Sequence, residues 1–156
     1  MIKFTRIDDR LVHGQVAFTW VPSIGADCLI VANDKVAKDE FLKMTLNLAK
    51  PASAKLLIKS LADTVTFLND PRSQPLKILL IVNSVKDASV LANELSEIQS
   101  VNFGGIRMKD GAKSISKAIA VTDDDIAVIK ELLGKGMELE VRQVPTDKKV
   151  LIETLI

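Results

Sequence analysis

The chain has 156 residues, 47% of them hydrophobic, which is enough to build one domain with a sizeable core. Its 21 lysine and arginine residues nearly balance its 20 aspartate and glutamate residues, leaving a formal net charge of +1. That balance provides no overall field for binding nucleic acid or an anionic membrane surface.

Membrane insertion and secretion are also disfavoured by the sequence. No apolar run reaches the roughly 18 residues that a transmembrane helix needs, and the residues after Met1 are too polar for a signal peptide. The single cysteine, Cys28, cannot form an internal disulfide, which is typical of a reducing compartment. We therefore expect a cytoplasmic protein without membrane insertion of its own.

Strand-like and helix-like stretches alternate along the chain. Apolar runs predict strands at 1–4, 28–32, 55–59, 78–82, 101–103 and 118–121, with 78–82, the most apolar, near the centre of the sheet. Apolar spacing predicts helices at 15–21, 39–50, 61–69, 85–98 and 122–133, with a stop and turn at 22–25 and Met44 in the core. Residues 137–144 predict a one-sided edge strand, and a short apolar helix closes the chain.

This alternation predicts a single α/β domain over residues 1–156. We expect an open, doubly wound, mostly parallel sheet with helices on both faces (α/β/α) and an antiparallel edge near the C-terminus. Thr122 and the three aspartates after it predict a helix cap, which explains these carboxylates better than a metal site.

His13, the only histidine, lies where the first predicted strand gives way to the first predicted helix. Ligands of open α/β sheets bind beyond the carboxyl ends of the strands, and a helix N-terminus there attracts anions. With Arg10 three residues before it, this imidazole is a candidate nucleophile for a phosphoryl group. The competing interpretations are an ordinary surface histidine, an Asp-Asp-Arg turn with a weak ion pair, and a glycine with simple turn chemistry.

The stretch RIDDRLVHGQV at 6–16 closely resembles the active-site segment of a bacterial protein family. The family comprises the IIB components of the mannose/fructose/sorbose class of the phosphoenolpyruvate-dependent sugar phosphotransferase system. The resemblance continues through Trp20, IVAND at 30–34 and NFGG at 102–105, and covers essentially the whole chain.

The resemblance implies a phosphocarrier with an open α/β/α fold. His13 would accept a phosphoryl group from a IIA protein and pass it to a sugar in a membrane IIC/IID permease. The chain would thus be the IIB subunit of a protein-N(π)-phosphohistidine–sugar phosphotransferase, peripherally associated with the permease. It would need no cofactor, and the family suggests Nδ1 as the phosphorylated nitrogen.

Several residues are candidates for holding the phosphoryl group. Arg10 offers a planar fork of donors to phosphate oxygens, and Gly14 and Gln15 offer backbone N–H groups at the helix start. Arg6 is a weaker candidate, because it could instead pair with a neighbouring aspartate, Asp8 or Asp9.

Other residues are candidates for shaping the pocket around His13. A carboxylate repels phosphate, so Asp9 is expected to orient His13 or Arg10, or to tie the loop down. Ser84 is the best additional phosphate donor, whereas Asn33 and Gly104 lie at the ends of other predicted strands and are candidates for lining the pocket. Whether Trp20 is in the core or faces a partner stays open.

Two alternative functions compete with the phosphocarrier. One is an anion-binding regulatory α/β domain that uses Arg10 without turnover. The other is a phosphohistidine hydrolase or mutase, which usually needs a second histidine or an acid partner, and the chain has no second histidine. The absence of G-x-x-x-x-G-K-[ST] and G-x-G-x-x-G motifs counts against an ATP-dependent sugar kinase.

Overall fold

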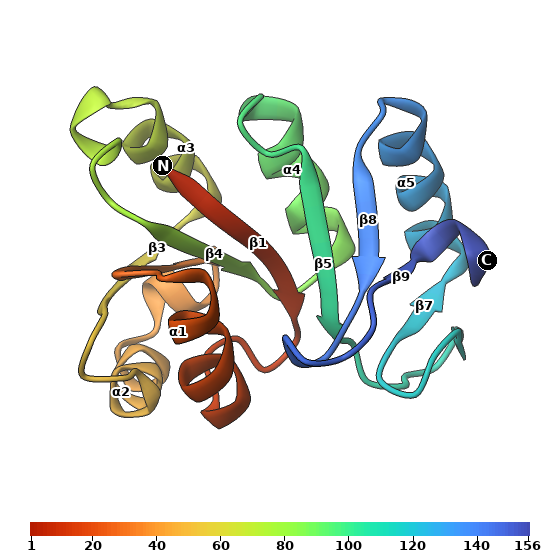
Figure 1. The fold of residues 1–156 in the computed structure, drawn as a ribbon, viewed down its shortest axis with the longest axis horizontal. Coiled ribbons are helices and arrows are strands. Elements are labelled where there is room, and N and C mark those ends of the chain that lie inside the picture. The colour runs from red at the N-terminus through yellow and green to blue at the C-terminus, as the bar shows by residue number, and fades with distance from the viewer.

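The computed structural model describes residues 1–156 and has a seven-stranded sheet at its centre (Figure 1). The strand order is β3-β2-β4-β1-β5-β8-β9, and every neighbouring pair is parallel except β8 and β9. The strands are β1 (Ile2–Asp8), β2 (Cys28–Ala32), β3 (Lys55–Lys59), β4 (Ile78–Val82), β5 (Ser100–Gly105), β8 (Glu138–Val141) and β9 (Val150–Leu151).

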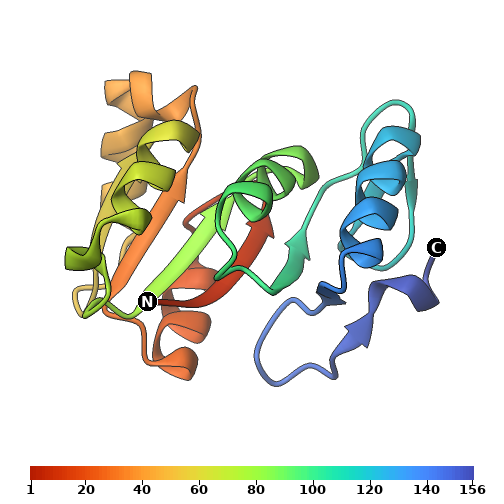
Figure 2. The same cartoon turned by 90° about the horizontal axis from the view of Figure 1, so that it is seen from above.

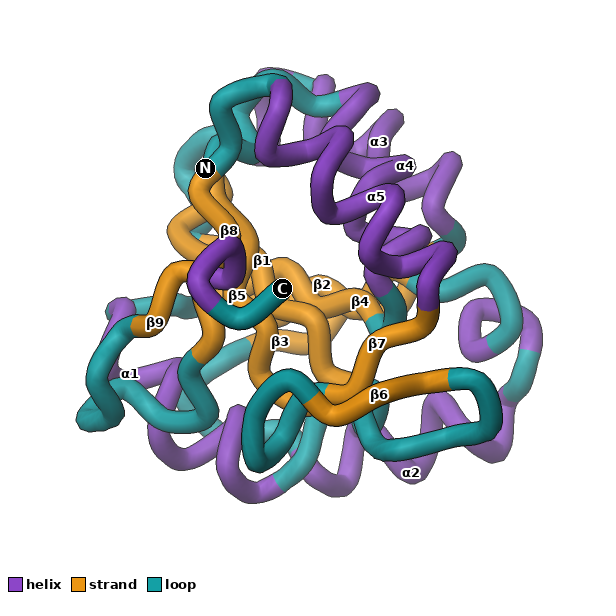
Figure 3. Tube along the Cα trace, turned by 90° about the vertical axis from the view of Figure 1, so that its right-hand side faces the viewer, coloured by secondary structure: helices purple, strands orange, loops and turns teal.

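Helices cover both faces of this sheet, as Figure 3 shows from the side. α1 (Val21–Ile24) and α2 (Glu40–Ala49) lie on one face, and α3 (Leu61–Asn69), α4 (Val85–Glu94) and α5 (Asp123–Gly134) lie on the other. The two faces have separate hydrophobic cores, one of 13 and one of 23 buried residues. The doubly wound α/β/α architecture with an antiparallel edge is therefore confirmed.

A small hairpin stands beside the carboxyl end of β5. It consists of β6 (Ala112–Ser114) and β7 (Ala120–Thr122), and a bridge between Ile106 and Ile119 joins it to the segment that follows β5. Figure 2 shows that this segment and α5 gather at one end of the molecule. The hairpin thereby becomes a wall near the first strand's carboxyl end.

Most predicted elements occur where the apolar patterns placed them. The strands at 28–32, 55–59 and 78–82 and the helix at 61–69 match the observed bounds, and the helix at 39–50 matches within one residue at each end. Side-chain oxygens cap four helices, since Asp39, Ser60, Ser84 and Thr122 each accept a hydrogen bond from a first-turn backbone N–H. Thr122 and Asp125 form the expected capping box.

The N-terminal region differs from the prediction in two ways. β1 continues to Asp8 rather than ending at Phe4, because the polar side chains of Arg6 and Asp8 are buried within the sheet rather than exposed after it. Helix α1 runs through Pro22, which stands in its first turn where no N–H is needed, and stops at Gly25 with φ 67°.

Other differences concern the ends and faces of elements. β4 is an interior strand, but β1 occupies the middle of the sheet; β9 rather than β8 is the edge. α4 ends at Glu94, four residues early, and the expected C-terminal helix is only a 3₁₀ turn, Ile152–Thr154. The strand expected at 118–121 is shifted to β7, and β6 was not predicted. Met44 faces solvent, because α2 turns Leu42 and Leu46 toward the core instead.

None of the helices is long and apolar enough to cross a membrane.

Candidate functional site

His13 lies in the loop that connects β1 to the first helical segment. Its Nε2 atom is 2.8 Å from Oδ2 of Asp8, the last residue of β1, and its side chain keeps 18% of its surface exposed. Between them, Leu11 adopts a left-handed conformation with φ 58°, and its N–H donates to the Asp8 carbonyl. Leu11 and Val12 are both buried, so apolar anchors hold the turn that carries His13 over the strand end.

Asp8 holds the imidazole with a carboxylate that is itself fully buried. Burial by itself raises the pKa of Asp8, but the hydrogen bond from His13, the charge of Arg6 and the backbone N–H of Arg10 outweigh it and keep this pKa below its ordinary value. The carboxylate is therefore ionised and can only accept hydrogen bonds. The tautomer that satisfies it carries the proton on Nε2, which leaves a lone pair on Nδ1 of His13.

Arg6 fixes Asp8 from below and is completely buried. Its guanidinium donates to Asp8 Oδ2 at 3.0 Å, to Asn102 Oδ1 at 2.8 Å and to the carbonyl of Arg142 at 3.2 Å. Burial lowers the pKa of Arg6, and the Asp8 charge opposes that shift. Because no surface of Arg6 is accessible, the expectation that it binds phosphate is wrong. Arg6 instead pairs with Asp8, which was the alternative given for it above.

Gly104 makes the space that Arg6 occupies. A Cβ at this position would overlap the guanidinium carbon and both terminal nitrogens of Arg6. Gly104 therefore has to lack a side chain, because the buried arginine fills the space that a Cβ would take. It also forms part of the wall of a neighbouring cleft.

Trp20 completes the support under the site and belongs to the core. It is 2% exposed, its ring stacks on Phe4 with centroids 4.4 Å apart, and its Nε1 donates to the Gln143 carbonyl at 2.8 Å. The guanidinium groups of Arg6 and Arg142 lie 5.5 and 5.0 Å from the indole centroid, which is cation–π distance. The turn of π-helix that carries Trp20, Val16–Trp20, is thus tied to the strand ends of β1 and β8.

Arg10 is the one cation beside His13 that keeps its side chain in solvent, at 51% exposure. Its backbone N–H donates to Asp8 Oδ1 at 3.1 Å, whereas its guanidinium comes only to 4.0 Å from the same oxygen. The fork of donors that sequence reasoning assigned to Arg10 is thus free to meet an anion near His13. The backbone N–H groups of Gly14 and Gln15 likewise have no hydrogen-bond partner within the chain.

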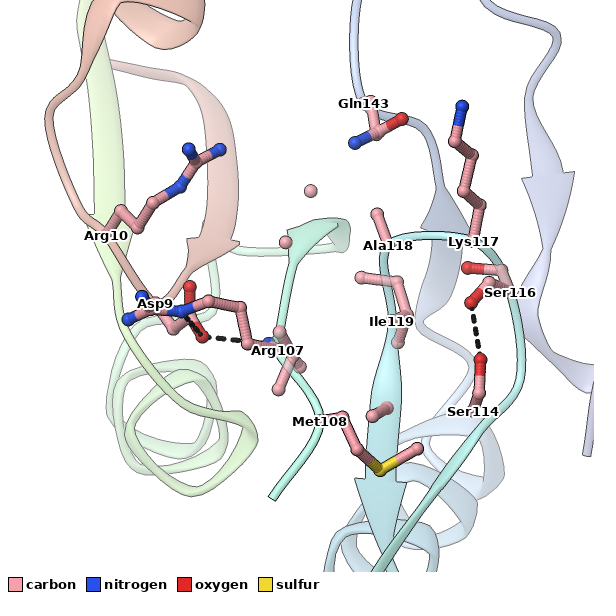
Figure 4. A pocket seen from close by; sticks show the side chains of 14 residues that line it. Asp9, Arg10, Arg107, Met108, Ser114, Ser116, Lys117, Ala118, Ile119 and Gln143 are labelled. Atoms are coloured by element: carbon pink, nitrogen blue, oxygen red, sulfur yellow. Dashed lines mark hydrogen bonds and ion pairs between the residues drawn. The ribbon is translucent and has the colours of Figure 1, made fainter.

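Asp9 turns away from His13, and Asp8 takes the position beside the imidazole that Asp9 was expected to hold. Asp9 Oδ2 accepts from the backbone N–H and Nε of Arg107, at 2.8 and 3.1 Å (Figure 4). The weighed alternative, that Asp9 ties the loop down, describes this geometry: the pair links the β1 loop to the segment after β5.

The remaining sequence candidates lie at other strand ends. Ser84 caps α4 by accepting from the Asp87 N–H at 3.1 Å. Because this bond leaves the Ser84 O–H able to donate, its role as a phosphate donor stays a prediction. Asn33 accepts from the Val36 N–H at 2.9 Å, and it shares a cleft of about 350 Å³ with Arg10.

Sequence reasoning missed the residues that reach the site from distant parts of the chain. They are Asn102, which lies in the resembling stretch 102–105 but was given no role, and Arg107, Arg142 and Gln143, which no local pattern marks. Asp8 was visible in principle, because residues two apart on a strand share a face, and Arg6 and Asp8 have that spacing.

Comparison with known proteins places this geometry in a family. The family model described as the sorbose subfamily IIB component of the PTS, the phosphotransferase system, matches residues 2–156. A probable phosphotransferase enzyme IIB component of Streptococcus pyogenes serotype M6 is 40% identical over 100% of this chain and 99% of its own length. The mannose-specific EIIAB component of Escherichia coli K12 is 34% identical over the whole chain, which spans 48% of that longer protein.

Solved structures agree with the sequence comparisons. The IIBSor domain of the sorbose permease from Klebsiella pneumoniae superposes with a TM-score of 0.93 and 32% identity, covering 97% of this chain and 93% of that one. The fold and the sequence therefore lead to one conclusion. The chain belongs to the sorbose subfamily of phosphotransferase system IIB components, which transfer a phosphoryl group from IIA to a sugar.

Proposed function

We propose that His13 is the residue on which this IIB component carries its phosphoryl group, and that Nδ1 is the nitrogen that forms the bond. The observation that carries the proposal is the 2.8 Å hydrogen bond between His13 Nε2 and the buried Asp8 carboxylate. It occupies Nε2 with a proton and leaves the Nδ1 lone pair as the nucleophile. The family motif around His13 supports the same assignment.

The transfer is a displacement at phosphorus. The Nδ1 lone pair forms the new N–P bond while the bond from phosphorus to the donor atom of the IIA protein breaks, and its electrons stay on that donor. Positive charge then spreads over the imidazole ring, where the Asp8 carboxylate stabilises it. In the onward step a sugar hydroxyl attacks phosphorus, the electrons of the N–P bond return to Nδ1, and the proton of the hydroxyl passes to water.

Arg10 supplies charge stabilisation in this scheme. Phosphoryl transfer depends mainly on positioning and on neutralising the charge of the equatorial oxygens. The half-exposed Arg10 guanidinium and the N–H groups of Gly14 and Gln15, which have no hydrogen-bond partner within the chain, are the donors that we assign to this task. Arg6 acts on the same chemistry through Asp8, without touching the phosphoryl group.

The partners of the reaction follow from the family and from the names of relatives. We expect a IIA protein as donor, since the Escherichia coli relative is named as a joined EIIAB component. The relatives are named for mannose, fructose and sorbose, so we expect the acceptor to be a hexose. A membrane IIC/IID permease would hold this sugar, and the chain would dock on the permease from the cytoplasm. Residues 1–156 would act there as a single IIB domain.

The decisive experiment is phosphorylation in vitro. The protein is incubated with phosphoenolpyruvate, the two general phosphotransferase proteins and a cognate IIA, and is then tested for an acid-labile, alkali-stable phosphate. His13→Ala should abolish labelling completely, because the chain has no second histidine. Labelling that persists in this variant would overturn the assignment. No labelling of the wild type by a IIA that is active on another IIB would favour the anion-binding domain instead.

A second measurement tests the nitrogen. Phosphorus–nitrogen couplings in a ¹⁵N-histidine-labelled sample should place the N–P bond on Nδ1, with Nε2 still protonated. A bond on Nε2 would contradict the role of Asp8 derived above. The matched variant is Asp8→Asn, in which the amide can donate to Nε2 and the preference for Nδ1 should weaken.

A further inference from the structure

A cleft of about 370 Å³ opens beside Arg10, on the side away from α2, and His13 is not among the residues that line it. Its walls come from the end of β1, from the segment after β5 and from the β6–β7 hairpin. Figure 4 shows Arg10 on one wall and Lys117 and Gln143 on the opposite one. The volume lies in the range of small-molecule sites, about 300–1,000 Å³.

The charges in this cleft are unbalanced. Arg10, Arg107 and Lys117 line it, and Asp9 is the only carboxylate among its residues. Asp9 is already paired with Arg107. The Lys117 side chain makes no ion pair within the chain, and Arg10 has no carboxylate closer than 4.0 Å. The cleft therefore has two cations without close partners facing each other across it, which favours an anionic ligand.

Polar groups that suit hydroxyls line the wall that carries Lys117 (Figure 4). Ser116 Oγ is buried and has no hydrogen-bond partner, which is unfavourable unless a ligand or water satisfies it. The Gln143 side chain projects into the cleft (Figure 4), while its backbone carbonyl is held by Trp20 Nε1. A lone phosphate would use only the cations, whereas a phosphorylated polyol would use the serine and the amide as well.

We infer that this cleft binds a sugar phosphate, with the phosphate between Arg10 and Lys117 and the hydroxyls toward Ser116 and Gln143. The inference rests on the proposed function only in its consequence. Because Arg10 would be shared between the cleft and the phosphoryl group on His13, a bound sugar phosphate would compete with phosphorylation. The product of sugar uptake would then slow further loading of the carrier.

Binding is tested on the unphosphorylated protein without IIA, so that its outcome is independent of phosphoryl transfer. Calorimetric titration compares glucose 6-phosphate, glucose and inorganic phosphate as probes. We expect glucose 6-phosphate to bind more tightly than inorganic phosphate, and glucose not to bind. Lys117→Gln should weaken binding of glucose 6-phosphate by at least about tenfold, since one charge-assisted contact is lost. Lys113→Gln is the matched control, because this exposed lysine of the same hairpin does not line the cleft.

Three results would overturn the inference. They are no binding of glucose 6-phosphate to the wild type, equal weakening by both lysine variants, and inorganic phosphate binding as tightly as the sugar phosphate. The consequence is tested separately by the initial rate of IIA-dependent labelling, which saturating glucose 6-phosphate should lower. A wild type that is labelled normally but binds no sugar phosphate removes this inference and leaves His13 as the carrier. A wild type that binds the sugar phosphate but is never labelled removes the proposed function instead.

Discussion

Replacing Gly104 by alanine should disturb the site from beneath without touching a reacting atom. The added methyl group would occupy the volume of the Arg6 guanidinium, which has no solvent-filled space to move into because its side chain is wholly buried. Arg6 must then give up hydrogen bonds to Asp8, Asn102 and the Arg142 carbonyl, or β5 must separate from β1.

The expected cost follows from what these contacts hold. Breaking a buried ion pair typically costs about 3–5 kcal/mol, because the remaining charge stays desolvated. A protein of this size has a free energy of unfolding of about 5–15 kcal/mol, so the loss would be a large fraction of it. Urea denaturation should show Gly104→Ala less stable than the wild type by about 3–5 kcal/mol.

Two comparisons separate this steric cause from a general intolerance of β5. Gly105→Ala is the matched control, since a Cβ there would meet Asp8 Oδ1 at 3.5 Å, an ordinary contact distance, and should cost about 1 kcal/mol or less. In an Arg6→Met background, which removes the guanidinium, Gly104→Ala should also cost little. Equal losses for both glycine variants, or additive losses for Arg6→Met and Gly104→Ala, would refute the reasoning.

Three further predictions concern charged groups. Arg10→Ala should slow IIA-dependent labelling by about 10²–10³-fold without changing the melting temperature. The control is Arg72→Ala, at an exposed arginine, which should change neither quantity. A normal labelling rate for Arg10→Ala would exclude its role in charge stabilisation. Because the pKa of Asp8 is lowered in the folded state, its ionised form contributes stability above about pH 4 that is lost as pH falls through the folded pKa. Urea denaturation at decreasing pH should therefore show a steeper loss of stability in the wild type than in Asp8→Asn, and parallel curves would contradict this. Hydrogen bonds from Arg72 lower the pKa of Asp70 to about 2, so an NMR titration of this carboxyl should have its midpoint at about pH 2. In Arg72→Gln the midpoint should move toward about 4. An unchanged midpoint in this variant would show that a group other than Arg72 sets the pKa.

The sequence was most informative where hydrophobic burial alone decides the structure. β2 and β4 are continuous apolar runs whose residues are all buried, so their bounds followed directly from composition. β1 was predicted too short because Arg6 and Asp8 are polar yet buried, and a polar residue normally signals that a strand has reached solvent. The error therefore fell on the residues that support the site.

Within the candidate site, local spacing placed His13 and Arg10 together at the end of the first strand. It named Asp9 rather than Asp8 as the carboxylate that orients His13, since the choice depends on where β1 ends and on the direction of each side chain. Contacts to Asn102 and Arg107 depend on β5 lying next to β1, a neighbour relation set by the order of strands in the sheet rather than by any local pattern.

The buried arginine also has a consequence for the order of events during synthesis. Arg6 is made almost at once, but two of its partners, Asn102 and the Arg142 carbonyl, lie 96 and 136 residues further along. Closing such long loops costs conformational entropy before the contacts form. The hydrogen bonds that hold Arg6 beneath the imidazole are therefore complete only after the last third of the polypeptide has been made. A chain still on the ribosome thus carries its histidine without the scaffold that orients it, and unfinished copies should draw few phosphoryl groups away from the finished ones.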